Sequence, residues 1–254
     1  MPRTTRSATA PTRPERRAAK RPQLPATLAV DIGASAVKAS VVDATGEPLA
    51  DRERVRTPRP CTPARLVKAT VTLARTLPPF NRVSVGFPGV IDRGVVYTAP
   101  NLGNQAFLGF HAVAAFEEQL GVPVRVVNDA DMHGLGVIRG HGVEVVITLG
   151  SGVGAALFLE GRLGPHLGFV VVNKGDVIDD LAAAGLDRLG PRKWSKRVQR
   201  LIDSLRELTN FRHLYVGGGN ADRLEIELPH DVSIVSNHAA LIGSVRVWDL
   251  KSGG

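Results

Sequence analysis

The stretch LAVDIGASAVKASVVD, residues 28–43, decides how this chain folds. Its two apolar runs, 28–33 and 36–43, have the composition of β-strands, and the small residues between them indicate a tight turn. A third run, PLADRERV at 48–55, follows the turn DATG. Together these runs predict an antiparallel meander of three strands.

Alternating helical and strand patterns follow the meander. Thr62 and Pro63 form a helix start, and the apolar residues after them recur at helical spacing until Pro78. The next segments are predicted as a strand at 82–87, a helix at 111–120 and a strand at 124–127. This alternation is typical of an α/β domain.

The second half of the chain opens like the first. Two strand-like runs, 144–150 and 154–160, are joined through the glycines of GSGVG at 150–154. A strand, HLYVGGG at 213–219, and an apolar helix from about 237 to 248 come later. The similar openings indicate an approximate internal repeat.

A long helix is predicted around residue 200, with one apolar and one basic face. The apolar face consists of Trp194, Val198, Leu201, Ile202, Leu205 and Leu208, and the basic face of Arg192, Lys193, Lys196, Arg197 and Arg200. An ordinary amphipathic helix has this pattern. A helix whose basic face helps to hold an extended phosphate compound has it too, and the sequence leaves both interpretations open.

The chain has 254 residues and a formal net charge of +8. Its first 26 residues hold seven Lys or Arg against the lone acid Glu15 and have no apolar periodicity, so we expect a disordered basic tail (1–26) with at most weak contacts to nucleic acid. The single cysteine, Cys61, excludes an internal disulfide and a multi-cysteine zinc site, and it agrees with a cytoplasmic location. No apolar run approaches the roughly 18 residues that a membrane-spanning helix needs.

Three glycine-containing turns each follow an apolar strand. Glycine lets the backbone approach a phosphate closely, and clustered amide N–H groups then form an anion site. One such turn is usually a plain hairpin, but three of them in this order predict a phosphate-binding site. The candidate ligands are Gly33 in the first turn, Gly150, Ser151 and Gly152 in the second, and Gly217, Gly218 and Gly219 in the third.

These turns resemble known motifs. DIGASAVK at 31–38 resembles the first phosphate motif of the actin/hexokinase/chaperone ATPase superfamily, GSGVG the second, and YVGGGN at 215–220 its nucleotide or donor motif. The segments between them, GFPGVIDRG at 86–94, TAPNLGNQAF at 98–107 and VPVRVVNDAD at 122–131, resemble the ROK family of bacterial repressors, open reading frames and kinases. Within that family, the missing zinc cysteines and the segment RKWSKRV are similar to the polyphosphate glucokinases.

The resemblance implies an α/β fold of two RNase H-like lobes, as in actin-like ATPases, with a cleft between them. We expect the first lobe at 27–112, joined by the C-terminal helix at about 237–254, and the second lobe at 113–236. A homodimer is also implied. The implied activity is transfer of a terminal phosphoryl group from polyphosphate or ATP to a sugar hydroxyl, as in glucokinases, with Mg²⁺ and without zinc.

The resemblance also assigns roles to residues. Asp129 matches the catalytic base, and the positive end of a helix starting there would keep it ionised; a plain helix cap would occupy the same position. Asn101 and Asn128 match residues that bond sugar hydroxyls. Asp31 matches the carboxylate near Mg²⁺, usually through water. Lys38 resembles the lysine of the motif, or it is only the exposed residue of an alternating strand.

One segment departs from the related glucokinases. Where these carry a glutamate and then histidines that grip the sugar, this chain reads PHLGFVVVNKGD, with Gly168, Val171 and Val172 at the corresponding positions. His166 lies nearby but is displaced, and Phe107 replaces a tryptophan. Losing two charged hydrogen bonds weakens sugar binding by about 10² to 10⁴-fold, which predicts a less polar acceptor or none.

The alternative to an active kinase is an impaired relative that binds a phosphate compound and acts through regulation or protein contact. A nucleic-acid-binding regulator is disfavoured, because 26 irregular residues are too few for a DNA-reading domain. The sequence determines neither the donor nor the acceptor.

Overall fold

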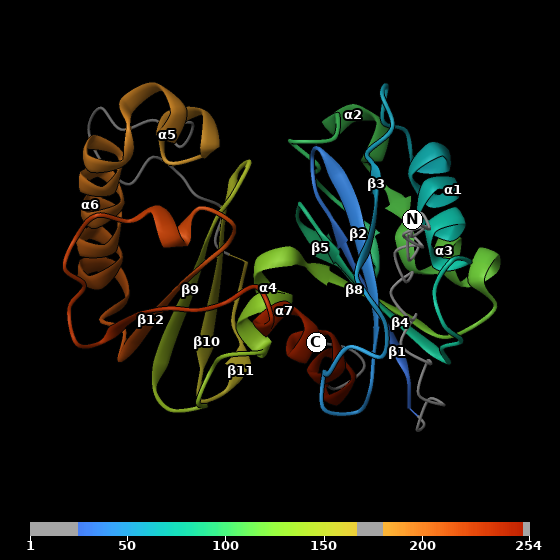
Figure 1. Cartoon of the computed structure of the whole chain (residues 1–254). Coiled ribbons are helices and arrows are strands. Elements are labelled where there is room, and N and C mark those ends of the chain that lie inside the picture. The colour runs from blue at the N-terminus through green and yellow to red at the C-terminus, as the bar shows by residue number, and fades with distance from the viewer. Residues whose placement is uncertain (1–24, 167–179, 251–254) are drawn as a thin grey trace, which may run out of the picture.

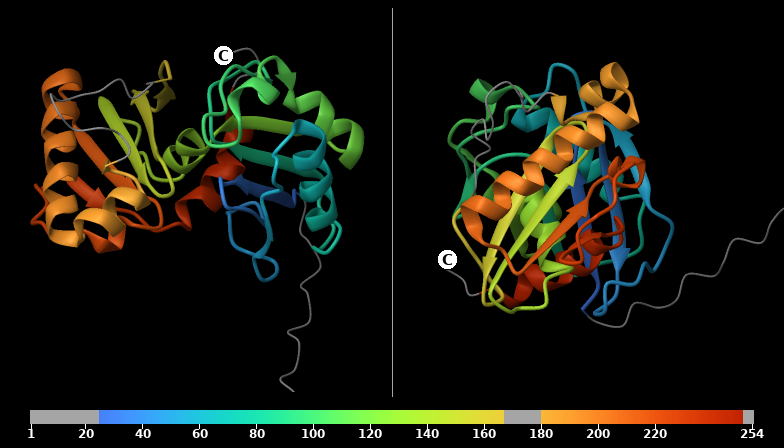
Figure 2. Two further views of the ribbon diagram at one scale, coloured as in Figure 1. Left: turned by 90° about the horizontal axis from the view of Figure 1, so that it is seen from above. Right: turned by 90° about the vertical axis from the view of Figure 1, so that its left-hand side faces the viewer.

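The computed structural model describes residues 25–166 and 180–250. They form two halves, each built around a five-stranded sheet, with α4 (Asp129–Leu135) and α7 (Ala239–Arg246) between the sheets (Figure 1). The left view in Figure 2, seen from above, shows the same division into halves.

The first sheet has the strand order β3-β2-β1-β4-β8. Its strands are β1 (Thr27–Ile32), β2 (Ala36–Val42), β3 (Glu53–Arg56), β4 (Arg82–Phe87) and β8 (Val124–Asn128). The expected meander of β1, β2 and β3 is confirmed, and β4 and β8 add parallel to β1. The run 48–55 is not one strand, because β3 begins only at Glu53 and Pro48 makes an isolated bridge to Val42.

Two helices and a small sheet complete the first half. Helices α1 (Pro63–Ala74) and α3 (Ala112–Leu120) bury Leu66 and Phe116 in the first core. The small sheet was missed by the sequence patterns because its strands are only two residues long. It consists of β5 (Ile91–Asp92), β6 (Val95–Val96) and β7 (Phe110–His111), with the short helix α2 (Asn104–Phe107) before β7.

The second sheet has the order β11-β10-β9-β12-β13. Its strands are β9 (Val143–Leu149), β10 (Val153–Leu159), β11 (Arg162–Leu163), β12 (His213–Gly217) and β13 (Val232–Ile234). Strands β9, β10 and β11 are antiparallel neighbours, whereas β12 runs parallel to both β9 and β13. The first sheet has the same order and the same strand directions, so the expected internal repeat is confirmed.

The expected boundary between the halves, at 112/113, needs correction. Strand β8 pairs with β4 from Val83↔Val124 to Phe87↔Asn128, and α3 packs against β8 and α1. Residues 113–128 therefore complete the first sheet, and the division by strand pairing falls at Asn128. Helix α7, which contacts β1 and β4 as well as α4, returns the chain to the first half.

Helices α5 (Ala183–Leu189) and α6 (Pro191–Thr209) belong to the second half. Helix α6 buries Trp194, Val198 and Ile202 against Ile147 and other members of the second core. The prediction that Leu208 belongs to this face is wrong: its side chain is 71% exposed, because the last turn of α6 extends beyond that core.

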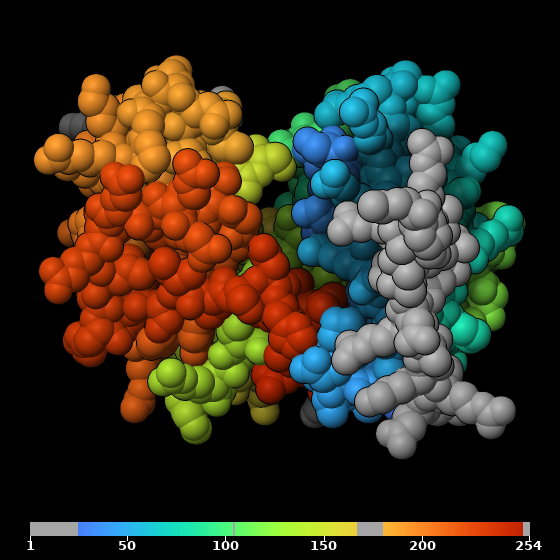
Figure 3. All heavy atoms as spheres, in the orientation of Figure 1, coloured from blue at the N-terminus to red at the C-terminus, as the bar shows by residue number. Residues whose placement is uncertain are grey.

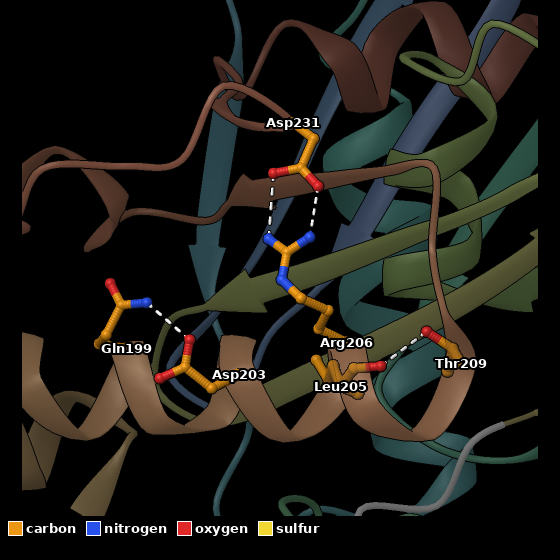
Figure 4. A network of polar contacts seen from close by, with 6 residues as sticks. All are labelled: Gln199, Asp203, Leu205, Arg206, Thr209 and Asp231. Carbon is orange, nitrogen blue, oxygen red and sulfur yellow. Dashed lines mark hydrogen bonds and ion pairs between the residues drawn. The ribbon is translucent and has the colours of Figure 1, made fainter.

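Polar contacts fix the far end of α6. Arg206 donates from Nη2 to Oδ1 of Asp231 at 3.0 Å and from Nη1 to Oδ2, which ties the helix to the residue before β13 (Figure 4). Nearer the middle of α6, Nε2 of Gln199 donates to Oδ1 of Asp203 at 2.9 Å. Hydrogen bonding to Arg206 lowers the pKa of Asp231, so this pair remains charged at neutral pH.

Glycines let α4 and α7 cross in close contact. A Cβ on Gly243 would lie 1.7 Å from the carbonyl oxygen of Met132, and one on Gly136 would lie 1.9 Å from that of Ala239. Backbone atoms cannot yield as a flexible side chain can, so any side chain here must push the two helices apart.

We therefore expect Gly243→Ala to lower the free energy of unfolding by about 3 kcal/mol. Alanine gains about 1 kcal/mol in helix propensity over glycine, which is less than the cost of separating α4 from α7. Thermal melts should show a Tm about 6 to 12 °C lower. Gly150→Ala is the matched control, because its Cβ would meet no atom closer than 3.9 Å; equal melting of the two variants would contradict the prediction.

The two halves meet along α4 and α7, and the space-filling view shows a notch between them that opens at the top of Figure 3. No helix among the described residues is long and apolar enough to cross a bilayer. The predicted site residues that the structure describes are therefore located relative to α4 and this notch.

Candidate active site

Helix α4 starts where β8 ends, and Asn128 fixes that start. Its Oδ1 accepts hydrogen bonds from the backbone N–H groups of Ala130 and Asp131, at 2.9 and 3.3 Å. Its Nδ2 donates to the carbonyl of Gly89 at 3.0 Å. Asn128 is therefore the N-cap of α4 and is only 6% exposed, so in this structure the amide that was expected to bond a sugar serves the helix.

Asp129 is the first residue of α4 and is half-buried. Burial, followed by the nearby carboxylate of Asp31, raises the pKa of Asp129 to about 7. The expectation that the helix terminus keeps Asp129 fully ionised is thus wrong, because burial outweighs the lowering effect of the hydrogen bond from Ala130. A carboxylate that titrates near neutrality can accept and release a proton under cellular conditions.

Asp131 occupies the first turn of α4, as predicted, and is 8% exposed. Burial and the charge of Asp129 raise the pKa of Asp131 to about 7. The α4 terminus therefore carries two acids, of which Asp129 is the more accessible to solvent.

Asp31 lies near the end of β1 and is about one-third exposed. Its Oδ2 is 3.7 Å from Nζ of Lys38, the residue opposite it on β2, and 3.1 Å from Nη2 of Arg52. Lys38 is thus an ion-pair partner of the first turn and is also partly exposed. Arg52 was missed, although the alternating arginines of the run RERVR at 52–56 were a signal for it.

The residues around Asp31 fit a magnesium ion that arrives with a phosphate compound. Mg²⁺ is commonly held by one or two carboxylates together with substrate phosphates and several waters. Asp31 and Asp129 supply two carboxylates close enough to influence each other. Among the described residues, no group of three or more His, Cys, Asp or Glu side chains is arranged to hold a metal without such help.

The second and third glycine turns contact each other. The backbone N–H of Asn220 donates to the carbonyl of Leu149 at 3.0 Å, and its Nδ2 donates to that of Gly150 at 3.2 Å. A Cβ on Gly218 would lie 2.4 Å from the Leu149 oxygen, so only glycine permits this approach. Gly150 itself closes the second turn by donating to the carbonyl of Gly152 at 2.9 Å.

The second turn also meets Asn101 and Asp129. A Cβ on Gly152 would lie 2.8 Å from Nδ2 of Asn101, and one on Gly154 would lie 3.8 Å from Oδ1 of Asp129. Gly33, two residues after Asp31, closes the first turn by donating to the carbonyl of Ala36 at 3.0 Å. Asn101 and Asp129 therefore lie against the second turn, and Asp129 is near enough to Asp31, which precedes the first turn, to be affected by its charge. Ser151 and Gly219 are exposed.

His133 lies behind the third turn and was missed by sequence reasoning. It is 5% exposed, and its Nε2 has no hydrogen-bond partner among the described residues. A Cβ on Gly217 would lie 2.6 Å from this nitrogen, so Gly217 leaves room for the ring. Burial lowers the pKa of His133, which keeps the imidazole neutral.

The segment that departs from the glucokinases falls mostly outside the described residues. Gly168, Val171 and Val172 lie outside the described residues, and His166 is exposed at their edge. Phe107 is fully buried, with its ring edge-to-face on Phe87 at 5.7 Å. Phe107 is thus a core residue of the first half.

The chain is similar in sequence to known proteins. The sequence model of the ROK family matches residues 27–169. Polyphosphate glucokinase of Mycobacterium tuberculosis (strain CDC 1551 / Oshkosh) is 29% identical over 235 residues, which cover 85% of this chain and 88% of that protein.

Solved structures extend the comparison. The inorganic polyphosphate/ATP-glucomannokinase of Arthrobacter sp. strain KM matches with a TM-score of 0.77 and 31% identity, over 87% of this chain and 96% of that one. A ROK family glucokinase of Streptomyces griseus, solved with glucose and AMPPNP, matches with a TM-score of 0.66 at 22% identity over 87% and 98%. The expected α/β fold of two actin-like lobes is confirmed.

Proposed function

Since the chain belongs to the ROK family, we propose that it is a sugar kinase, which moves a terminal phosphoryl group from polyphosphate or ATP onto a sugar hydroxyl. The observation that supports this most is the half-buried carboxylate of Asp129 at the start of α4. It lies beside Asp31 and against Gly154 of the second glycine turn, and its pKa is raised to about 7.

Each part of this site has a task in phosphoryl transfer. The backbone of the three glycine turns binds the donor phosphates, and Asp129 accepts the proton of the attacking hydroxyl. The hydroxyl oxygen bonds to the terminal phosphorus as the bridging P–O bond breaks, and ADP or a shortened polyphosphate leaves. Mg²⁺, held by Asp31 and the donor phosphates, would neutralise phosphate charge. Asn101, whose amide lies against Gly152 of the second turn, would orient the acceptor.

The proposal is tested by offering the purified protein, with Mg²⁺, either ATP or polyphosphate and a panel of sugars that includes glucose, mannose and an N-acetylated hexosamine. A new phosphate monoester in ³¹P NMR spectra is the expected result. An impaired regulatory relative, the alternative that Gly168, Val171 and Val172 support, would instead show a donor-dependent rise in Tm without turnover of any sugar. That outcome would replace the kinase proposal.

The pH profile of this activity follows from Asp129. The base must be ionised, and its pKa is about 7, so kcat/KM should rise about ten-fold per pH unit below pH 7 and level off above about pH 8. Steady-state rates at saturating donor and limiting sugar measure this. A profile that is flat between about pH 5.5 and 8 would exclude a base with this pKa.

A further inference from the structure

Four cationic side chains share one face of the first sheet. Strand pairing sets Asp31 opposite Lys38, Lys38 opposite Arg54, and Ala36 opposite Arg56. Directly opposed residues project from the same face, and alternate residues of one strand do so as well. Arg52 precedes β3 and reaches the same face, since it bonds Asp31 at 3.1 Å. We call Lys38, Arg52, Arg54 and Arg56 the cation strip.

The opposite face of these strands is closed. Val37 and Val55, which alternate with the strip residues, pack in the core beneath α1. The face that carries the strip is the one that packs on α7. Ala29 projects from the same face as Asp31 and pairs with Ser84. The hydroxyl of Ser84 donates to the carbonyl of Ser244 on α7 at 2.6 Å. The strip therefore lies along the edge strand β3. Arg56 is opposite Ala36, which closes the first glycine turn, Arg54 is opposite Lys38, and Arg52 bonds Asp31. Arg54 and Arg56 are exposed.

The strip has the chemistry of a phosphate site with a defined direction. Within residues 25–166 and 180–250, the ion pairs of the strip are those of Lys38 and Arg52 with Asp31, so most of the positive charge of the strip is not balanced by a carboxylate there. Guanidinium groups bind phosphate oxygens in a fork geometry that lysine cannot reproduce. Arg59 adds a further cation beside the first turn, where it donates to the carbonyl of Ala34 at 3.0 Å.

We propose that the cation strip binds the distal part of a linear inorganic polyphosphate whose terminal phosphoryl group lies at the glycine turns. The inference rests on the proposed kinase function. From Arg52 to Arg56 the chain advances about 13 Å, which accommodates several consecutive phosphoryl groups. ATP has only three phosphoryl groups, followed by uncharged ribose and base, so a row of cations of this length is matched to a longer phosphate chain.

The other basic surface, on α6, is less suited to this role. Helix α6 packs on the face of the second sheet that carries Val145 and Ile147, whereas α4 packs on the face that carries Val146. The basic residues of α6 are thus on the side away from Asp129, and Arg197 is bonded to Asp180 at 2.7 Å.

The test compares Arg54→Gln/Arg56→Gln with Lys196→Gln, an exposed cation of α6 on the face of the second sheet away from α4. Direct binding of long-chain polyphosphate and of tripolyphosphate is measured by calorimetry at two salt concentrations. The double variant should bind long chains about ten-fold more weakly, with a smaller salt dependence, and tripolyphosphate about as well as the unchanged protein. Lys196→Gln should match the unchanged protein with both.

Kinetics provide the second measurement. In the double variant the KM for polyphosphate should rise about ten-fold relative to the KM for ATP. Three results would each overturn the inference. The double variant could bind long chains as well as the unchanged protein does, or it could lose equal affinity for tripolyphosphate and for long chains. The unchanged protein could also bind duplex DNA more tightly than polyphosphate. Phosphorylation from ATP without any binding of polyphosphate would overturn it while the kinase proposal stands, and absence of turnover from both donors would instead remove the kinase proposal itself.

Discussion

Asp129→Asn is expected to lower kcat for sugar phosphorylation by about 10² to 10⁴-fold, the range that positioned general bases contribute. Asparagine keeps the size and the hydrogen bonding of the residue but cannot accept the proton. Because the glycine turns remain in place, the KM for the donor should change little. Steady-state kinetics with each donor at saturating sugar measure both quantities.

Asp131→Asn is the matched control. It removes a neighbouring carboxyl group whose pKa is raised to about 7 as well, but whose side chain is buried behind the helix terminus. Its kcat should stay within a few-fold of the unchanged protein. Equal loss in the two variants would show that charge at the α4 terminus, and not proton transfer by Asp129, limits the reaction.

Stability gives Asp129→Asn a second readout that activity does not affect. The pKa of Asp129 rises from 3.8 to about 7 on folding, so between these values the folded chain keeps a proton that the unfolded chain has lost. The preference of the folded state for this proton contributes to the free energy of unfolding in full below about pH 4, and the contribution is lost as the pH rises through 7. The variant, which never ionises, should therefore be more stable than the unchanged protein at pH 8, and the difference should shrink toward pH 5.

Local patterns were sufficient for most of the fold. The alternation at 28–43 and the Thr62–Pro63 start produced β1, β2 and α1 nearly as predicted, because each signal is contained within one element. The boundary between the halves was placed too early, because membership of β8 in the first sheet depends on pairing with β4, about 40 residues away. Pairing over that distance leaves no periodicity in the sequence.

The candidate site shows the same limit. Glycine in the sequence indicated the turns, because only glycine readily adopts left-handed backbone conformations and allows another backbone to come close. The cap that Asn128 makes is local, since its Oδ1 accepts from the N–H groups of Ala130 and Asp131. The sequence could not show that its Nδ2 bonds the carbonyl of Gly89, which is 39 residues away. Nor could it give the pKa of Asp129, which depends on burial between two halves and on the distance to Asp31.

The third glycine turn provides the other large expected effect. Gly218 has φ +89°, a left-handed conformation, and its Cβ would lie 2.4 and 2.5 Å from the carbonyl oxygen and amide nitrogen of Leu149. Gly219, the next residue, has open space around its Cβ position. These two adjacent glycines therefore differ in what alanine would meet, although the sequence motif treats them alike.

We expect Gly218→Ala to lower the free energy of unfolding by about 3 kcal/mol, because strain at positive φ of about 1 to 2 kcal/mol adds to the backbone clash. The clash also separates Asn220 from Leu149 and Gly150, so the KM for ATP or polyphosphate should rise at least about ten-fold where the protein remains folded. Gly219→Ala should change both quantities little. Since Leu149 leads directly into the second turn, donor binding that survived Gly218→Ala would mean that the second and third turns act independently, and the shared phosphate site would have to be abandoned.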